Sequence, residues 1–159
     1  MQSQQDEVSA AGGADAPTHL ADLVRRAARR TPDAAAIVDV SAGTSLTWAE
    51  FDAAVDDETE RLREAGVGAG DRVVIALDNG APLCLSLFGA LRADAVAVPV
   101  APWSVPRELD AVLINCSPSV VVADPDGRIT ESINGRSAIV SLAPPDVSST
   151  GGARSGRER

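Results

Sequence analysis

Arg72-Val73-Val74-Ile75-Ala76-Leu77, followed by Asp78-Asn79-Gly80, is the stretch that decides how the rest of the chain folds. The run is apolar without interruption after Arg72 and lacks the alternation of a strand that has one face in water. A strand of this kind is covered on both faces, so it belongs in the middle of a sheet. Asp-Asn-Gly then supplies ordinary turn chemistry at its end.

Helices and strands alternate on the C-terminal side of this run. Residues 81–93 are apolar nearly all round, which predicts a helix sandwiched between two layers, and 95–98 predicts a second buried strand. A helix from Pro106 to Ile114, a strand at 119–123 and one more strand at 137–142 complete the expected elements. The alternation predicts an α/β fold, namely part of a doubly wound parallel sheet with helices on both faces.

The N-terminal side of the run predicts a helix, a small hairpin and a second helix. The pattern becomes helical from Thr18 to Arg30, and residues 34–40 and 45–47 read as two strands joined by a tight turn. Thr47 and Glu50 have the spacing of a capping box, which predicts a helix that runs to Ala65.

This second helix is expected to be amphipathic, with Gly66 as its left-handed stop. The side chains expected on the buried face are Trp48, Phe51, Val55 and Leu62. Those expected in water are Asp56, Asp57, Glu58, Glu60, Arg61 and Arg63.

The chain has 159 residues, enough for one domain with a core but short for a two-domain nucleotide-dependent ligase. The expected organisation is a disordered N-terminus over 1–16, a folded unit over 17–143 and a disordered tail over 144–159. The tail is expected because its composition changes abruptly to Pro, Ser, Gly and Arg, with little to bury.

Composition excludes several classes of function. The net charge of −9 disfavours nucleic acid as a partner. All 14 basic residues are Arg, and without Lys neither a Walker-type phosphate loop nor a Schiff-base enzyme can be built. His19 is the only His, and Cys84 and Cys116 are too far apart in sequence for a CxxC motif, so a triad or a zinc site is not expected. No apolar run reaches membrane-spanning length, and a cytoplasmic location is expected.

Four segments are candidate sites, and each also has a simpler structural interpretation. Asp78-Asn79-Gly80 lies just past a central strand, where open α/β sheets hold ligands, but it is also plain turn sequence. Gly66-Val67-Gly68-Ala69-Gly70 follows a helix, which is the wrong order for a dinucleotide fingerprint. Asp56, Asp57, Glu58 and Glu60 read as a solvated helix face, and Ser148 to Gly152 with Arg154 as flexible tail. We therefore assign no catalytic, cofactor-binding or metal-binding residue.

Several motifs in order resemble the N-terminal portion of the adenylate-forming superfamily. They are Thr31-Pro32-Asp33 to Val38, Leu46-Thr47-Trp48-Ala49-Glu50-Phe51, Gly66 to Val73 with Asn79 after it, and Phe88 to Pro99. Trp48 stands where the family has Tyr, Arg92 where it often has Lys, and Asp94 where it usually has Gly. Asp94 is expected to affect a tight turn, because Gly avoids a side-chain clash there.

The resemblance implies an activity in which a carboxylate attacks the α-phosphate of ATP, with magnesium and, in many members, coenzyme A. The phosphate loop and the catalytic Lys of the family lie beyond the matched motifs, so we expect this chain to be inactive alone. Three interpretations stay open: a truncated synthetase remnant, half of a split enzyme that needs a partner chain, or a binding module. Self-association through an open sheet is a further expectation.

Overall fold

The computed structural model describes residues 19–40, 43–133 and 139–147. In this part of the chain it has five helices and six strands. The helices are α1 (Asp22–Arg30), α2 (Trp48–Glu64), α3 (Ala81–Arg92), α4 (Pro106–Cys116) and α5 (Arg128–Ile133). The strands are β1 (Ala35–Asp39), β2 (Thr44–Thr47), β3 (Arg72–Ala76), β4 (Val96–Pro99), β5 (Val120–Ala123) and β6 (Val140–Leu142).

The main sheet has four parallel strands in the order β4-β3-β5-β6. β3 therefore lies inside the sheet, as its uninterrupted apolar sequence predicts, and Val73 pairs with Ala97 on one side and Val120 on the other. The fold class expected from the sequence is confirmed.

Alternate side chains of β3 and β5 point to opposite faces and build two separate cores. Val73, Ile75, Val120 and Val122 pack toward α3. Val74, Ala76, Val121 and Ala123 instead pack against α4 and α5. None of the eight is more than 2% exposed, so neither face of these strands reaches water.

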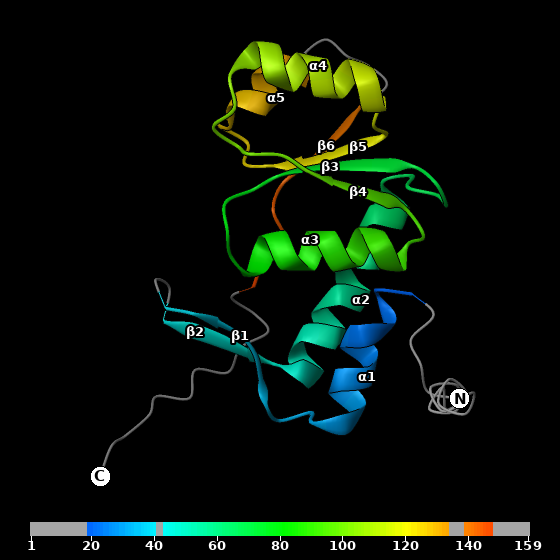
Figure 1. The fold of residues 1–159 in the computed structure, drawn as a ribbon, viewed down its shortest axis with the longest axis vertical. Coiled ribbons are helices and arrows are strands. Elements are labelled where there is room, and N and C mark those ends of the chain that lie inside the picture. Colours follow the sequence, from blue (N-terminus) through cyan, green and yellow to red (C-terminus); the bar gives the residue numbers. More distant parts are fainter. Residues whose placement is uncertain (1–18, 41–42, 134–138, 148–159) are drawn as a thin grey trace, which may run out of the picture.

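The helices form layers on both faces of this sheet (Figure 1). α4 and α5 cover one face, and α3 covers the other. α1 and α2 pack on the far side of α3, which explains why α3 is apolar nearly all round. In the described part of the chain, no helix has the length and apolar character needed to cross a membrane.

The hairpin and the helix that follows it also form as predicted. β1 and β2 pair antiparallel, and a complete capping box starts α2. The Glu50 N–H donates to Thr47 Oγ1 at 3.2 Å, and the Thr47 N–H donates to Glu50 Oε2 at 2.8 Å. Beyond it, the Phe51 ring packs edge-to-face against Phe88 of α3.

α2 and α3 approach each other closely at Gly89, and here one prediction was wrong. Glu58 was expected in water, but it is 2% exposed. Its position lies on the face of Val55 and Leu62, and Arg61 Nε donates to its Oε2 at 2.7 Å. The absence of a side chain at Gly89 makes room for the Glu58 stem.

The structure differs from the sequence-based expectations at three further places. The first helix begins at Asp22 rather than Thr18, and Leu20 is 53% exposed. β4 was expected to be buried, but it is an edge strand whose Val96 is 49% exposed. α5 was not predicted, because Ile129 and Ile133 are the only apolar pair in a short polar segment.

The expected N-terminus 1–16 and residues 148–159 of the expected tail lie outside the described residues, and so do residues 137–138 of the strand expected over 137–142. Residues 144–147 of the expected tail are described. Val147 packs against the cluster formed by α1, α2 and α3.

Left-handed backbone occurs at the turns that join helices to strands. Gly66 ends α2 with φ 92°, and Gly70 follows with φ 79°. Asp94, which joins α3 to β4, has φ 58°, and its carbonyl accepts from the Gly70 N–H at 2.8 Å. The expectation that Asp94 occupies a turn suited to Gly is therefore met.

Replacing Gly89 by Ala should destabilise the fold. The added Cβ would lie 2.6 Å from Glu58 Cγ and 3.4 Å from the Thr59 backbone nitrogen, so α2 and α3 must separate. We expect a loss of about 1–3 kcal/mol in the free energy of unfolding, measured by urea denaturation. Gly68→Ala is the matched control, because its nearest neighbour would be at 3.6 Å, and a loss as large in the control would contradict the packing argument.

Replacing Asp94 by Gly should stabilise the fold by roughly 0.5–1 kcal/mol, since Gly has no Cβ to strain the left-handed backbone. Thermal unfolding of the two proteins measures the difference. Gly70→Ala is the converse test: no atom would lie within 4 Å of its Cβ, so only backbone strain can lower stability. An Asp94→Gly protein that is less stable than the parent would show that the Asp94 side chain makes a compensating interaction.

Candidate functional site

The carboxyl edge of the parallel sheet is the place where a fold of this type binds ligands. Asp78 and Asn79 follow β3 there and are exposed, while Gly80 leads into α3. Gly80 also lies beside the hairpin, since a Cβ on it would be 3.8 Å from Asp39 Oδ2. The predicted location of Asp78-Asn79-Gly80 is therefore correct, but this does not make it a binding site.

The neighbouring loop at the same edge adds acidic rather than basic groups. Asp124 and Asp126 follow β5 and are exposed. Asp124 is held by its backbone, because its carbonyl accepts from the Gly127 N–H and from Thr130 Oγ1. Only Arg128 adds a positive charge to this loop. These residues do not fit a nucleoside triphosphate, whose phosphates need cations and convergent N–H donors.

The opposite, amino edge holds a cation that is already engaged. Arg72 Nε donates to the Cys116 carbonyl at 2.7 Å, and its Nη2 donates to the Ser117 carbonyl at 2.8 Å. These carbonyls belong to the C-terminal end of α4, where positive charge is favoured by the helix dipole. Arg72 thus joins β3 to α4.

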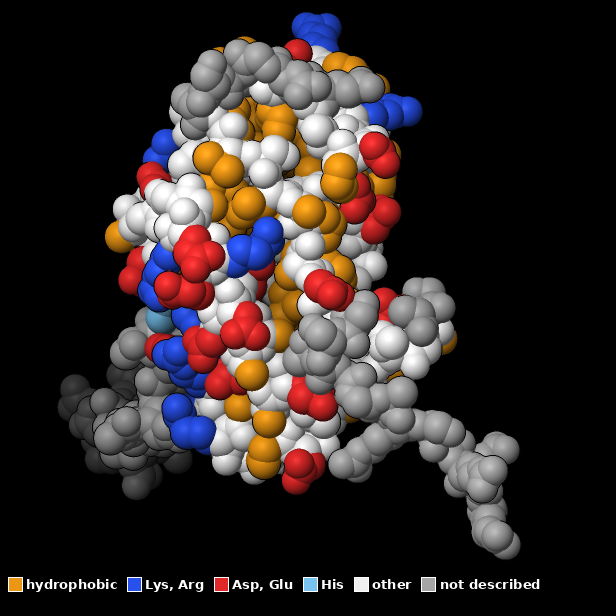
Figure 2. All heavy atoms as spheres, turned by 180° about the vertical axis from the view of Figure 1, so that it is seen from behind, with side chains coloured by type: hydrophobic (Ala, Val, Ile, Leu, Met, Phe, Trp, Pro, Cys, Tyr) orange, Lys and Arg blue, Asp and Glu red, His pale blue; other side chains and the backbone are white. Residues whose placement is uncertain are grey.

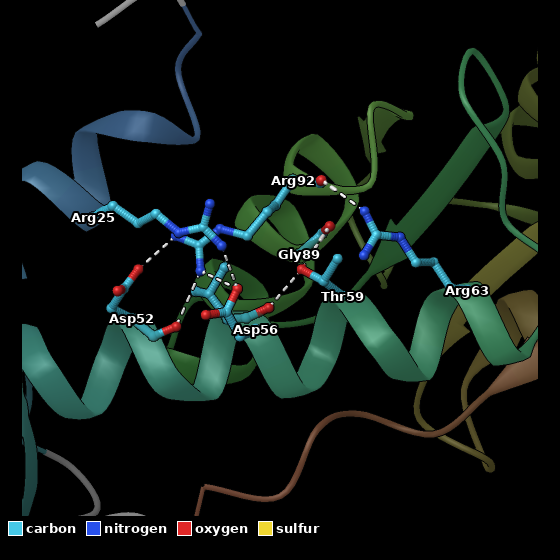
Figure 3. Close-up of polar contacts among 8 residues, drawn as sticks. Arg25, Asp52, Asp56, Thr59, Arg63, Gly89 and Arg92 are labelled. Carbon is cyan, nitrogen blue, oxygen red and sulfur yellow. Dashed lines mark hydrogen bonds and ion pairs between the residues drawn. The ribbon is translucent and has the colours of Figure 1, made fainter.

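A polar cluster joins α1, α2 and α3 (Figure 3). At its centre is Arg92 of α3, whose side chain is 6% exposed. It donates to Asp52 Oδ1 at 2.6 Å, to Asp56 Oδ1 at 2.9 Å and to the Asp52 carbonyl at 3.1 Å. Arg25 of α1 reaches the same Asp56 oxygen at 2.8 Å. Every partner is a helix residue of this chain, so the cluster serves helix packing.

Two of the three other candidate segments can be placed in the structure. Gly66 to Gly70 forms a helix-to-strand turn, as its order in sequence requires. Asp57 and Glu60 are exposed, whereas Asp56 and Glu58 are each bound to Arg side chains. Over residues 19–40, 43–133 and 139–147, no group of three or more His, Cys, Asp or Glu could hold a metal ion. The Ser148 to Gly152 segment and Arg154 lie outside the described residues.

The two cysteines are not suited to nucleophilic chemistry. Burial raises the pKa of the Cys84 thiol above its ordinary value. Burial also raises the pKa of the Cys116 thiol, although a backbone hydrogen bond and the charge of Arg72 oppose the effect. Both thiols therefore stay protonated at neutral pH, and the thiolate is the reactive form.

The structural roles of Arg72 and Arg92 and the burial of Glu58 were not predicted from the sequence. Each lies in an amphipathic or strand pattern that looks ordinary in sequence. The partners that define these roles are far away in sequence: Arg72 reaches Cys116 and Ser117, 44 and 45 positions away, and Arg92 reaches Asp52, 40 positions away. The only signal for Glu58 was its spacing from Val55 and Leu62.

A family model for AMP-binding enzymes matches residues 24–153. Two similar proteins come from Mycobacterium tuberculosis. The salicyl-AMP ligase / salicyl-S-ArCP synthetase is 35% identical over 109 residues, which are 66% of this chain and 19% of that protein. The long-chain-fatty-acid–CoA ligase FadD13 is 27% identical over 126 residues, which are 70% of this chain and 25% of that protein.

Solved structures show the same fold. The crystal structure of the N-terminal domain of FACL13 from Mycobacterium tuberculosis has a TM-score of 0.74 at 22% identity, covering 80% of this chain and 34% of that one. VinN has a TM-score of 0.71 at 24% identity, covering 79% of this chain and 31% of that one. The chain thus spans about a fifth to a third of the proteins and domains that it resembles.

Replacing Arg92 by Met should loosen the packing of the three helices. The variant keeps an apolar stem but leaves Asp52, whose side chain is 23% exposed, without its cation. Because Asp52 and Asp56 both retain some contact with water, we expect a loss of about 1–3 kcal/mol in the free energy of unfolding, less than for a fully buried pair. Urea denaturation measures it.

Arg25→Met is the control within the same cluster. The side chains of Arg25 and Asp56 are 46% and 51% exposed, so the variant should lose less than about 1 kcal/mol. Arg92→Lys should fall between the two, because an ammonium cannot reproduce the planar fork of donors. Equal losses for Arg25→Met and Arg92→Met would show that Arg92 holds no special position.

Proposed function

The chain belongs to the AMP-binding enzyme family, and from this premise we propose that it is the N-terminal scaffold of an ATP-dependent carboxylate-adenylating enzyme and has no adenylating activity alone. The family match over residues 24–153 carries the proposal, together with the small share of the relatives' length that the chain spans.

The charged groups of the chain support the absence of adenylating activity from this scaffold. Adenylyl transfer needs cations and hydrogen-bond donors arranged around phosphate oxygens. The chain contains no Lys, and the carboxyl edge of its sheet presents Asp78, Asp124 and Asp126. Three of the cations are already engaged: Arg61 binds Glu58, Arg72 binds the end of α4, and Arg92 binds Asp52.

A split enzyme is the form of this proposal that would give the chain a catalytic role. In it, a separate polypeptide supplies the portion of the relatives that this chain does not span, together with the groups that bind ATP, magnesium and, where used, coenzyme A. The exposed edges and half-exposed apolar side chains Leu83 and Leu87 of α3 would support such an assembly. The cytoplasmic location expected from the sequence stays a prediction.

The substrate of the whole enzyme is proposed only as a class. Relatives carry names that refer to salicylate, to long-chain fatty acids and to hydroxybenzoates. Salicylate and the hydroxybenzoates are aromatic hydroxy acids, whereas long-chain fatty acids are aliphatic, so the carboxylate is the group that all of them share. We therefore propose a carboxylic acid and no particular one.

Purified residues 1–159 should release no pyrophosphate from ATP, magnesium and a panel of aromatic and aliphatic carboxylic acids. Full-length FadD13 of Mycobacterium tuberculosis, assayed with a long-chain fatty acid, is the positive control. Circular dichroism on the same sample must show a folded protein, so that a lack of pyrophosphate release cannot be ascribed to unfolding. Pyrophosphate release that Asp78→Asn or Asn79→Ala abolishes would contradict the proposal and would place a working site at the carboxyl edge.

A further inference from the structure

The Asn79-Gly80 dipeptide lies in a bend between β3 and α3, where its chemistry differs from that of other Asn residues in the chain. The side-chain amide of an Asn is open to attack by the backbone nitrogen of the next residue. Gly favours this attack, because it has no Cβ to obstruct the approach and restricts the backbone least. Asn79 is exposed, so water reaches its amide.

The backbone nitrogen of Gly80 is available for this attack. The carbonyl of Gly80 accepts from the Cys84 N–H at 3.3 Å, but over the described residues the Gly80 N–H has no hydrogen-bond partner. Gly80 is also the N-cap of α3, and no side chain caps this helix. The positive end of the helix dipole therefore favours the negative charge that the nitrogen acquires when it loses its proton.

Two comparable dipeptides in the described part of the chain are held differently. Asp126-Gly127 could cyclise in the same way with loss of water, but the Gly127 N–H donates to the Asp124 carbonyl at 2.9 Å. Asn115-Cys116 belongs to α4, where helical hydrogen bonds engage the backbone nitrogens. The side chains of Asn79, Asn115 and Asp126 are all exposed, so the state of the following nitrogen distinguishes them.

We propose that Asn79 is a site of spontaneous deamidation in the folded protein. The Gly80 nitrogen loses its proton to solvent and bonds to Asn79 Cγ. The bond between Cγ and the side-chain nitrogen breaks, so ammonia leaves and a succinimide remains. Water then opens the ring: attack at Cγ gives an aspartate in place of Asn79, and attack at the backbone carbonyl gives an isoaspartate, whose backbone runs through the former side chain.

Either product changes the carboxyl edge of the sheet. The net charge goes from −9 to −10, because a neutral amide becomes a carboxylate. The new carboxylate joins Asp78, Asp124 and Asp126, and Figure 2, in which this edge lies toward the right, shows acidic side chains on that side. The modification therefore makes this edge still less favourable to phosphate groups as the protein ages.

The isoaspartate product also lengthens the link between β3 and α3. It adds one backbone carbon between Leu77 and Ala81, which are each 5% exposed and fixed in the core. The link must then bulge into water. This inference goes beyond the proposed function and does not depend on whether the chain, alone or in a complex, adenylates anything.

Incubation of folded residues 1–159 from neutral to mildly alkaline pH, followed by digestion at acidic pH and peptide mapping by mass spectrometry, tests the proposal. We expect conversion of Asn79 that speeds up with pH, since the attacking nitrogen must lose a proton. Enzymatic methylation of the free α-carboxylate should detect the isoaspartate product. Asn115 and Asp126 should stay unmodified over the same period.

A synthetic peptide with the sequence of residues 77–83, incubated in parallel, gives the rate without the fold. Complete conversion of this peptide while Asn79 of the protein stays intact would overturn the proposal. Asn134-Gly135 repeats the dipeptide outside the described residues. Its product is followed in a separate peptide, so that it is not counted at Asn79.

Gly80→Ala tests the role of the attacking nitrogen. Gly80 has extended backbone with φ 167°, which Ala also adopts, and the added Cβ would lie 3.6 Å from Pro82 Cδ and 3.8 Å from Asp39 Oδ2. The variant should therefore fold with an unchanged urea midpoint. Conversion of Asn79 should slow several-fold or more, because the Cβ hinders the approach of the nitrogen. An unchanged rate would overturn the proposed route.

Gly68→Ala is the matched control, because its added Cβ also has its nearest neighbour at 3.6 Å and Gly68 does not follow an Asn. Conversion of Asn79 should proceed in this variant at the rate of the parent protein. A Gly68→Ala protein that slows as much as Gly80→Ala would contradict a local reaction between Asn79 and Gly80.

Discussion

The burial of β3 on both faces is the constraint on which the rest of the structure depends. Val73, Ile75 and Leu77 require an apolar layer on one side, and Val74 and Ala76 require another on the opposite side. α3 supplies the first layer and α4 with α5 supplies the second. Because α3 is itself covered by α1 and α2, one strand places three further layers of helices around it.

The parts of the fold that sequence could predict are those with a local physical cause. The capping box at Thr47 and Glu50, the stop at Gly66 and the buried run of β3 each carry their reason in a few neighbouring residues. Glu58 could not be placed correctly, since its burial depends on the space left by Gly89 in another helix. The edge position of β4 depends on strand order, which the sequence of β4 does not contain.

The same division applies to function. The resemblance to adenylate-forming enzymes rests on segments of helices, turns and strands, and the structure assigns these motifs to packing. Arg72 and Asp71 of the Gly-Asp-Arg-Val stretch show this well: Asp71 Oδ2 accepts from the Gly68 N–H within the turn, and Arg72 caps α4. Asp94 and Arg92 of the Phe88 to Pro99 motif serve a turn and a helix junction. The motifs therefore identify a scaffold, whose chemistry we propose to lie elsewhere in the enzyme.

Native-state amide hydrogen exchange of residues 1–159 tests most directly whether β3 and its neighbour organise this scaffold. The account predicts that the amides of Val74, Ile75, Val121 and Val122 exchange slowest, through global unfolding alone, and that the edge strand β4 and the hairpin of β1 and β2 exchange faster. If the hairpin or α1 proved as protected as β3, or if β3 exchanged as quickly as the edge strands, the central place given to the doubly buried strand would be contradicted.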